Sequence, residues 1–311
     1  MSVAMLGGYA ADAAFGDPRR GHPVAGFGSA AIALERKTYS PTRLRGALFA
    51  GALIATVGVA VESIGSATAR KRVGGTVVFG AVTWASLGGH SLAIAAREVA
   101  DALERGDLEA ARRRLPSLVG RDVSELDEQM ICRAVVESVA ENTSDAVVGA
   151  LLWGALLGPA GVAMFRAANT LDAMVGHRTE RYENFGWASA RLDDVLGWPA
   201  ARLTALLAAV CAPIVGGSPT ETLRVVRRDG AEHPSPNAGR AEAAFAGALG
   251  LRLGGPISYG GHDEARGYLG DGAEPRVLDL ERCVRLASAV GLSALAACSV
   301  VRAARSRVTR S

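Results

Sequence analysis

Long stretches without charged side chains are the feature that most restricts how this chain can fold. Residues 46–61 carry no charge, and residues 73–96 contain His90 as their only titratable group. A membrane-spanning helix needs about 20 mostly apolar residues, and a charge at its centre costs about 2.5–3.5 kcal/mol. We therefore predict two membrane spans in the first third of the chain.

Three further stretches are predicted to enter the membrane, namely 146–165, 203–220 and 286–301. The first of them contains Gly158 and Pro159 near its middle. Proline lacks a backbone donor and clashes with the preceding turn, so the helix should break there. Residues 146–165 are thus either one broken span or a tight helical hairpin, and the sequence leaves both open.

The fold class follows from these stretches: an all-α, polytopic integral membrane protein with about five membrane segments. Only 21% of the 311 residues are charged and the mean hydropathy is +0.20, whereas a soluble domain averages about 25% charged residues. Residues 97–114 and 121–141 repeat apolar positions every three or four residues, which predicts helices outside the bilayer. Without a linker or repeat, residues 1–311 are expected to form a single helical membrane domain.

Composition also excludes several classes of function. A net charge of +3 is too small for binding nucleic acid through its phosphates. The four cysteines form no CxxC pair, so we expect them to be buried apolar residues rather than disulfides or zinc ligands. The first residues lack the pattern of a secretory signal, so insertion is expected to depend on internal segments.

A first polar block, residues 15–24, places Asp17 and His22 between two prolines. Prolines fix a turn, and such a turn is either an interfacial loop with solvated charges or part of a binding site.

A second block precedes residue 146. If its helix is regular, Glu137, Glu141 and Asp145 line one face, where like charges repel unless a cation lies between them.

Mg²⁺ suits that second block, because it binds a few carboxylate oxygens together with waters and phosphates. The alternative is a solvated helix face with Asp145 as a helix cap.

A third block begins at Asn169, which shares a helix face with Asp172, and Gly176 is a plausible helix end. Arginines downstream suit carboxylate or phosphate ligands, because the guanidinium binds them through two hydrogen bonds. Arg191 and Asp194, three residues apart, are interpreted first as an ordinary helix-surface pair. A fourth block contains Asn237, which either caps the following helix or belongs to a phosphate-binding loop.

Common nucleotide and hydrolase motifs do not support another enzyme class. Residues 26–31 fit half of a dinucleotide fingerprint, but no predicted strand precedes them. The sequence contains no GxxxxGK[ST], HExxH or GxSxG motif. A standard ATPase, zinc protease or α/β-hydrolase is therefore not indicated.

Taken in order, the polar blocks resemble the adenosylcobinamide-phosphate synthase family of cobalamin biosynthesis. The resemblance spans nearly the whole chain. Its most specific parts are residues 16–18 with 22–24, 136–145, 169–176, 190–194 and 235–239. Two departures are His177, where the family usually has tyrosine, and residues 196–199, which replace a longer segment containing asparagine. These departing positions should not be essential.

The resemblance implies an ATP-dependent amide ligase. It would join (R)-1-amino-2-propanol, or its O-phosphate, to the f propionate of (adenosyl)cobyric acid, giving (adenosyl)cobinamide or its phosphate. ATP and Mg²⁺ would take part, with the corrinoid as substrate. The candidate metal ligands are Glu137, Glu141, Asn142 and Asp145, and the candidate proton acceptors are Asp172, Asp193 and Asp194, which the sequence does not rank. The candidate substrate-binding residues are Asp17, His22, Asn169, Arg178, Arg181, Arg191 and Asn237.

A membrane transporter or a membrane phosphotransferase is the alternative, because broken helices and acids inside the membrane also occur in transport. We expect a multi-pass protein of the cell membrane. Its partners would be small molecules and lipid, with either further copies of the chain or other membrane proteins of cobalamin biosynthesis. No nucleic-acid partner is expected.

Overall fold

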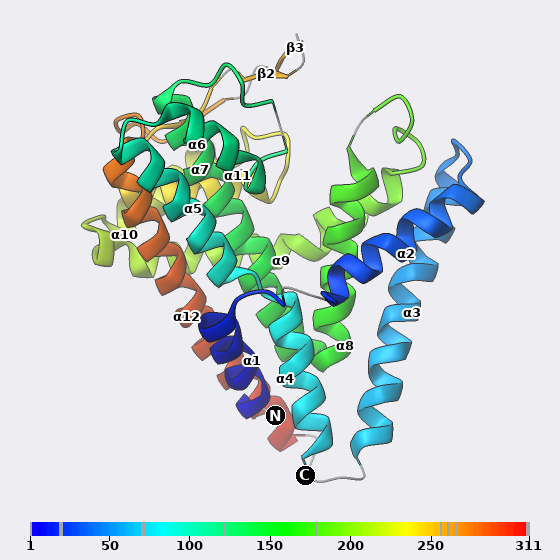
Figure 1. Ribbon diagram of the computed structural model, residues 1–311. Helices are drawn as coiled ribbons and strands as arrows, with labels where there is room; N and C mark the ends of the chain where they lie inside the picture. Colours follow the sequence, from blue (N-terminus) through cyan, green and yellow to red (C-terminus); the bar gives the residue numbers. More distant parts are fainter. Residues whose placement is uncertain are drawn as a thin grey trace. The chain divides into compact units, whose positions relative to one another are not determined.

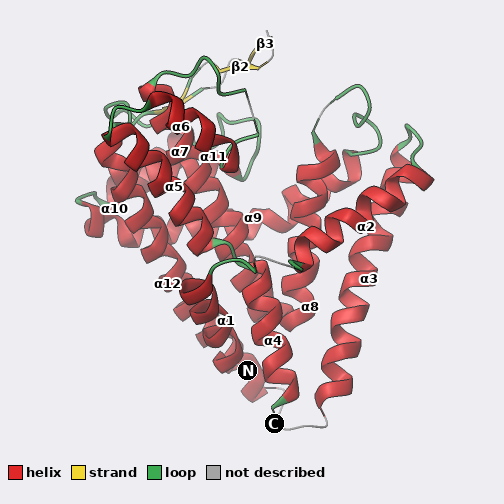
Figure 2. Ribbon diagram, viewed as in Figure 1, coloured by secondary structure: helices red, strands yellow, loops and turns green. Residues whose placement is uncertain are grey.

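The computed structural model describes residues 2–18, 21–69, 73–120, 122–177, 179–255, 257–259, 262–264 and 267–308. Helices dominate it (Figure 1 and Figure 2), as the sequence predicts. In chain order they begin with α1 (Ser2–Phe15), α2 (Pro23–Thr38), α3 (Arg43–Ala69), α4 (Gly74–Ser86), α5 (Gly89–Glu104), α6 (Leu108–Arg114) and α7 (Glu128–Asn142). Then follow α8 (Ala150–Leu171), α9 (Trp187–Cys211), α10 (Pro219–Asp229), α11 (Ala238–Leu249) and α12 (Val277–Val308).

Within the described ranges, five helical stretches are long and apolar enough to cross a membrane. They are Arg43–Thr68, Gly74–Glu104, Glu128–Gly176, Trp187–Val215 and Val277–Arg305. The prediction of about five segments is confirmed. The fourth stretch begins before the predicted 203, because α9 already starts at Trp187, and it ends where Gly216 takes a positive φ of 79°.

The chain divides into two compact units. Unit 1 contains Met1–Gly88, Asp145–Pro199 and Leu295–Ser311, and unit 2 contains Gly89–Ser144 and Ala200–Ala294.

Small residues let the helices of unit 1 approach closely, as in other membrane helix pairs. The helix α1 packs on α4, where a Cβ added to Gly8 would lie 2.7 Å from the carbonyl oxygen of Gly80. The helix α3 packs on α8, where Gly58 faces the sulfur of Met164. A buried apolar cluster that includes Phe185 joins α2, α3 and α8.

The helix α8 reverses direction at Gly158, whose φ of 74° and ψ of −157° are not helical. A Cβ added to Gly154 would lie 2.8 Å from Cγ2 of Val162. In a straight helix, residues eight apart are separated by about 12 Å along the axis. Residues 150–157 and 159–171 are therefore two limbs of a hairpin, and of the two alternatives for this segment the hairpin is correct.

Arg302 of α12 stabilises the break. In a continuous helix the carbonyl of Ala155 would accept a hydrogen bond from residue 159, but Pro159 has no N–H to donate. Nη1 of Arg302 donates to that carbonyl instead, at 3.4 Å. The guanidinium also lies 5.7 Å from the centroid of the Phe79 ring.

Unit 2 is built around α11, whose residues from Ala238 to Leu249 are all buried except Arg240. It packs against α7 and α10, and Gly247 lies close enough to α10 that an added Cβ would be 2.8 Å from Cα of Thr222. Short strands, which the sequence did not predict, follow α11. They are β1 (Leu253–Gly254) paired with β4 (Tyr268–Leu269), and β2 (Ile257–Tyr259) paired with β3 (His262–Glu264).

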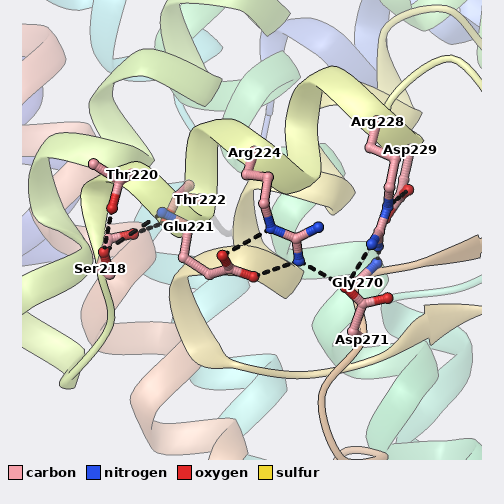
Figure 3. A network of polar contacts seen from close by, with 9 residues as sticks. All are labelled: Ser218, Thr220, Glu221, Thr222, Arg224, Arg228, Asp229, Gly270 and Asp271. Atoms are coloured by element: carbon pink, nitrogen blue, oxygen red, sulfur yellow. Dashed lines mark hydrogen bonds and ion pairs between the residues drawn. The ribbon is translucent and has the colours of Figure 1, made fainter.

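An ion-pair cluster ties the segment after β4 to α10 (Figure 3). Asp271 accepts hydrogen bonds from Arg224 and Arg228, and Asp229 pairs with Arg228 while accepting from the backbone N–H of Gly270 at 2.8 Å. The hydrogen bonds from Arg228 and Arg224 lower the pKa of Asp271 to about 2. The Arg228 hydrogen bond likewise lowers the pKa of Asp229.

Candidate functional site

Asn169 stands at the centre of a polar cluster in unit 1. Its Nδ2 donates to Oδ2 of Asp145 at 3.3 Å and to Oδ1 of Asp193 at 3.4 Å, and its Oδ1 accepts from Nη1 of Arg166 at 3.3 Å. The hairpin in α8 explains this meeting, because reversal near residue 158 brings position 145 beside position 169. The structure thus joins residues of the second and third sequence blocks with α9.

Arg166 was not predicted as a site residue. Besides Asn169, its guanidinium interacts electrostatically with the carboxylates of Asp17 and Asp145. The available signal was its position directly after the uncharged run 146–165. A charged side chain inside a membrane helix is a functional candidate by default, because burying it is costly.

The first sequence block contributes Asp17 and His22. Nε2 of His22 lies 3.9 Å from Oδ1 of Asp17. Nδ1 of His22 accepts a hydrogen bond from the backbone N–H of Val24 at 3.1 Å, so His22 also caps the start of α2. In this turn, His22 therefore caps α2, and the carboxylate of Asp17 interacts electrostatically with Arg166.

A cavity of about 350 Å³ lies beside this cluster, between α2, α3, α4 and α8. Its walls are mostly apolar and include Phe27, Val57 and Val82, together with several alanines. Arg166 and Thr170 provide polar groups from α8. The cluster is thus bordered by a space for part of a ligand.

The predicted acidic face of α7 is not regular. After Asn142 the helix continues as a π-helix, η2 (Thr143–Gly149), whose hydrogen bonds connect residues five apart. The regular α-helical spacing assumed for Glu137, Glu141 and Asp145 therefore does not continue to Asp145. The condition attached to that prediction, a regular helix, is not met.

Within unit 2, Glu137 is buried, and its Oε1 accepts a hydrogen bond from the backbone N–H of Gly254 at 2.9 Å. Arg133 donates to the carbonyl of the same glycine at 2.9 Å. Glu141 is exposed. Nδ2 of Asn142 donates to the carbonyl of Ser138 at 2.9 Å. Glu137 thus has a structural partner that the sequence did not reveal.

No group of three or more His, Cys, Asp or Glu side chains in the described part of the chain is arranged to hold a metal ion. Asp145 and Asp193 nevertheless provide carboxylate oxygens, the donor type that Mg²⁺ prefers, whereas the oxygen of Asn169 accepts from Arg166. Mg²⁺ usually keeps waters and phosphate oxygens as further ligands, so one or two carboxylates suffice. The two carboxylates at this cluster are therefore of the donor type that a Mg²⁺ site uses.

The remaining residues of the third block have separate partners. Asp172 begins a second π-helix, η3 (Asp172–Gly176), and folds over Gly176, where an added Cβ would collide with its carboxylate. Nη1 of Arg191 lies 3.5 Å from Oδ2 of Asp194, which confirms the intrahelical pair.

Two predicted arginines remain. Arg181 binds the buried carboxylate of Glu35, with Nη2 to Oε1 at 2.9 Å, and lies over the ring of Tyr39. These contacts hold the loop against α2. Arg178 lies outside the described residues.

In unit 2, Asn237 is buried and its Oδ1 accepts from Nη1 of Arg202 at 3.1 Å. Asn237 is the N-cap residue of α11, as one of the two interpretations predicted, but its side chain makes no capping hydrogen bond. Oγ of Ser235 instead accepts from the backbone N–H of Ala238 at 3.2 Å. Nε2 of His233, two residues before Ser235, lies 3.8 Å from Oε1 of Glu242, and this buried pair was not predicted from the sequence.

The four cysteines, Cys132, Cys211, Cys283 and Cys298, are all buried and free, as predicted.

Comparison with known proteins supports the resemblance seen in the sequence. The family described as CobD/Cbib protein matches residues 5–287. The cobalamin biosynthesis protein CobD of Mycobacterium tuberculosis (strain H37Rv) is 51% identical over 305 residues, which cover 97% of this chain and 96% of the relative. The protein of the same name from Pelobacter propionicus is 43% identical over 267 residues, 84% and 82% of the two chains.

No solved structure matches this chain. The apolar helical stretches agree with the hydropathy of the sequence. The chain therefore belongs to the CobD/Cbib family of cobalamin biosynthesis proteins, and it is a multi-pass helical membrane protein.

Proposed function

We propose that this protein is an ATP-dependent amide ligase of the cell membrane. It would join (R)-1-amino-2-propanol, or its O-phosphate, to the f propionate of (adenosyl)cobyric acid. The observation that supports a reaction centre in unit 1 is the Asn169 cluster, where the carboxylates of Asp145 and Asp193 meet the guanidinium of Arg166 through one amide. Groups from distant parts of the sequence converge there.

The proposed chemistry starts from a carboxylate, which is a poor acylating agent. ATP would convert it to an acyl phosphate, and bound Mg²⁺ supplies charge stabilisation at the phosphates. The amine must reach the carbonyl carbon unprotonated. Its ammonium therefore gives a proton to a carboxylate, its nitrogen forms the C–N bond, and the C–O bond to phosphate breaks. One acyl phosphate and one ammonium thus give the amide, hydrogen phosphate and one proton.

The contacts suggest a ranking of the candidate aspartates. Asp193 is our preferred proton acceptor, because the Asn169 amide holds it beside Asp145, and a general base must be held within reach of its proton. Asp194 is paired with Arg191 and Asp172 is folded over Gly176. We propose Asp145 as the main Mg²⁺ ligand, retain the exposed Glu141 as a second candidate, and assign Glu137 a structural role.

The test is incubation of the detergent-purified protein with cobyric acid, ATP, Mg²⁺ and each amine, with the product identified by mass spectrometry. Asp145→Asn and Asp193→Asn should each abolish ligation. The control is Glu109→Gln on α6, whose carboxylate is largely exposed and paired with Arg112, and it should keep full activity.

Glu141→Gln distinguishes between the two proposed metal ligands. Full ligation activity in this variant would exclude Glu141 as an essential Mg²⁺ ligand and leave Asp145. Ligation without nucleotide, or in excess chelator, would exclude the proposed mechanism. Absence of product together with corrinoid uptake into vesicles containing the protein would instead identify a transporter.

A further inference from the structure

The cavity beside the Asn169 cluster has mostly apolar walls, and the proposed ligation reaction does not by itself require an apolar cavity. Apolar side chains from α2, α3, α4 and α8 form most of its wall. Its volume of about 350 Å³ lies at the lower end of the range of about 300–1,000 Å³ found for small-molecule sites. Such a space fits an aliphatic group better than a polar one.

Among the residues that the structure describes, Arg166 is the charged one that lines this cavity. Its Nη1 donates to Asn169, but its Nε is buried and has no hydrogen-bond acceptor within the described ranges. A buried donor without an acceptor costs about 1–3 kcal/mol. Arg166 is thus incompletely hydrogen-bonded and lines the cavity, and guanidinium groups bind carboxylates with favourable geometry.

The acids near Arg166 do not form the wall of the cavity. Asp17 and Asp145 interact with the guanidinium but are absent from the lining residues. Among the described lining residues, a ligand in the cavity therefore meets mostly alkyl groups, two hydroxyl groups and the guanidinium of Arg166.

We propose that this cavity binds an aliphatic carboxylate, with its chain against the apolar walls and its carboxylate at Arg166. In the ligation reaction this ligand would be the propionate arm of the corrinoid, an identification that rests on the proposed function. The volume admits one arm and excludes the macrocycle, so the ring stays outside. The same chemistry occurs in a free fatty acid of the membrane, and the experiment distinguishes the two sources.

Equilibrium binding to the detergent-purified protein, without ATP or amine, provides the test. The probes are cobyric acid, palmitate and 1-hexadecanol, the last having the same chain length as palmitate but no carboxylate. Ala60→Phe fills the cavity from α3, because Ala60 lines it. Ala52→Phe is the matched control, since Ala52 is exposed on the same helix and is not a lining residue.

We expect Ala60→Phe to weaken binding of a carboxylate probe at least tenfold, while Ala52→Phe changes it less than twofold. Arg166→Gln should weaken carboxylate binding by a similar factor, and Arg166→Lys should restore part of it. Binding of 1-hexadecanol should fall in Ala60→Phe and remain unchanged in Arg166→Gln, because only the carboxylate uses the guanidinium.

If Ala60→Phe and Arg166→Gln weaken the binding of cobyric acid, the ligand is the propionate arm of the corrinoid. If they weaken the binding of palmitate alone, the ligand is a membrane fatty acid. The proposal is overturned if the wild type binds neither acid, if Ala60→Phe binds both normally, or if Arg166→Gln weakens 1-hexadecanol equally. Failure of ligation with Arg166-dependent binding intact would refute the proposed function alone. Normal ligation with unchanged kinetics in Ala60→Phe would refute the cavity assignment alone.

Discussion

Glu137 and Asp145 lie on one helical run, yet their carboxylates have different partners. Asp145 is bound by the side-chain amide of Asn169, and Glu137 is bound by the backbone of Gly254. Two acids that looked equivalent in the sequence therefore have different expected consequences when they are changed. One is proposed to act on a ligand, and the other fixes the start of the β1–β4 pair.

Glu137→Ala should destabilise unit 2 by about 1–3 kcal/mol, because the buried N–H of Gly254 loses its acceptor. Glu137→Gln should cost less, since its amide oxygen can still accept that hydrogen bond. A thiol-reactive fluorophore can follow thermal unfolding in detergent, because all four cysteines are buried in the folded chain. Equal unfolding temperatures for the alanine variant and the wild type would contradict this role.

Some contacts of single residues could not be predicted from the sequence. The partner of Glu137 is 117 residues away, and no local pattern indicates a contact over that separation. Arg166 was overlooked because it follows an apolar run and belongs to none of the polar blocks. By contrast, the pairing of Arg191 with Asp194 depended only on helix geometry, and it was predicted correctly.

At the scale of elements, hydropathy located the membrane helices, and Gly158 with Pro159 identified the position of the break in α8. Local rules could not choose between a kink and a hairpin, because that choice depends on contacts between the two limbs. The π-helical turns could not be predicted either, since they depend on packing around residues 143–149. The strands after α11 are too short to produce a recognisable alternation.

Gly158→Ala should destabilise the hairpin by about 1–3 kcal/mol, because its φ of 74° and ψ of −157° lie in a region that only glycine tolerates. The proposed ligation should fall with it, as Asp145 and Asn169 meet through this reversal. Gly51→Ala is the control, since an added Cβ on α3 meets no other atom within 4 Å.

That control should be stabilised by about 0.5–1 kcal/mol, the usual difference between glycine and alanine inside a helix. Thermal unfolding of both variants provides the measurement. Loss of stability in both, or in neither, would show that the break does not depend on the conformation of Gly158.

The contact between α10 and the segment after β4 should weaken in acid. The pKa of Asp271 is lowered to about 2 and that of Asp229 is also lowered, so the folded chain binds fewer protons than the unfolded chain. Their stabilising effect is present above the ordinary carboxyl pKa of about 4 and is lost as the pH falls toward about 2.

Circular dichroism melts between pH 5 and pH 2 would measure this loss. Asp271→Asn removes one of the two lowered pKa values, so its melting temperature should depend less steeply on pH over that interval. Parallel curves for the variant and the wild type would contradict the contribution of Asp271.

At the scale of the whole molecule, the five apolar stretches are too long and too numerous for attachment to a membrane surface. The protein should therefore remain entirely in the membrane fraction after extraction with alkaline carbonate, and detergent should be needed to release it. Immunoblotting of the two fractions provides the measurement. Recovery as a soluble monomer without detergent would contradict the architecture.

The reversal at Gly158 also determines whether this segment crosses the membrane an even or an odd number of times. A hairpin that enters the bilayer and turns back contributes an even number of crossings, so we expect Asp145 and Asn169, at its two ends, to lie on the same side of the membrane. Counting hydrophobic peaks along the sequence would assign them to opposite compartments. Cofactors or substrates supplied from one side of the membrane can therefore reach both flanks of this hairpin.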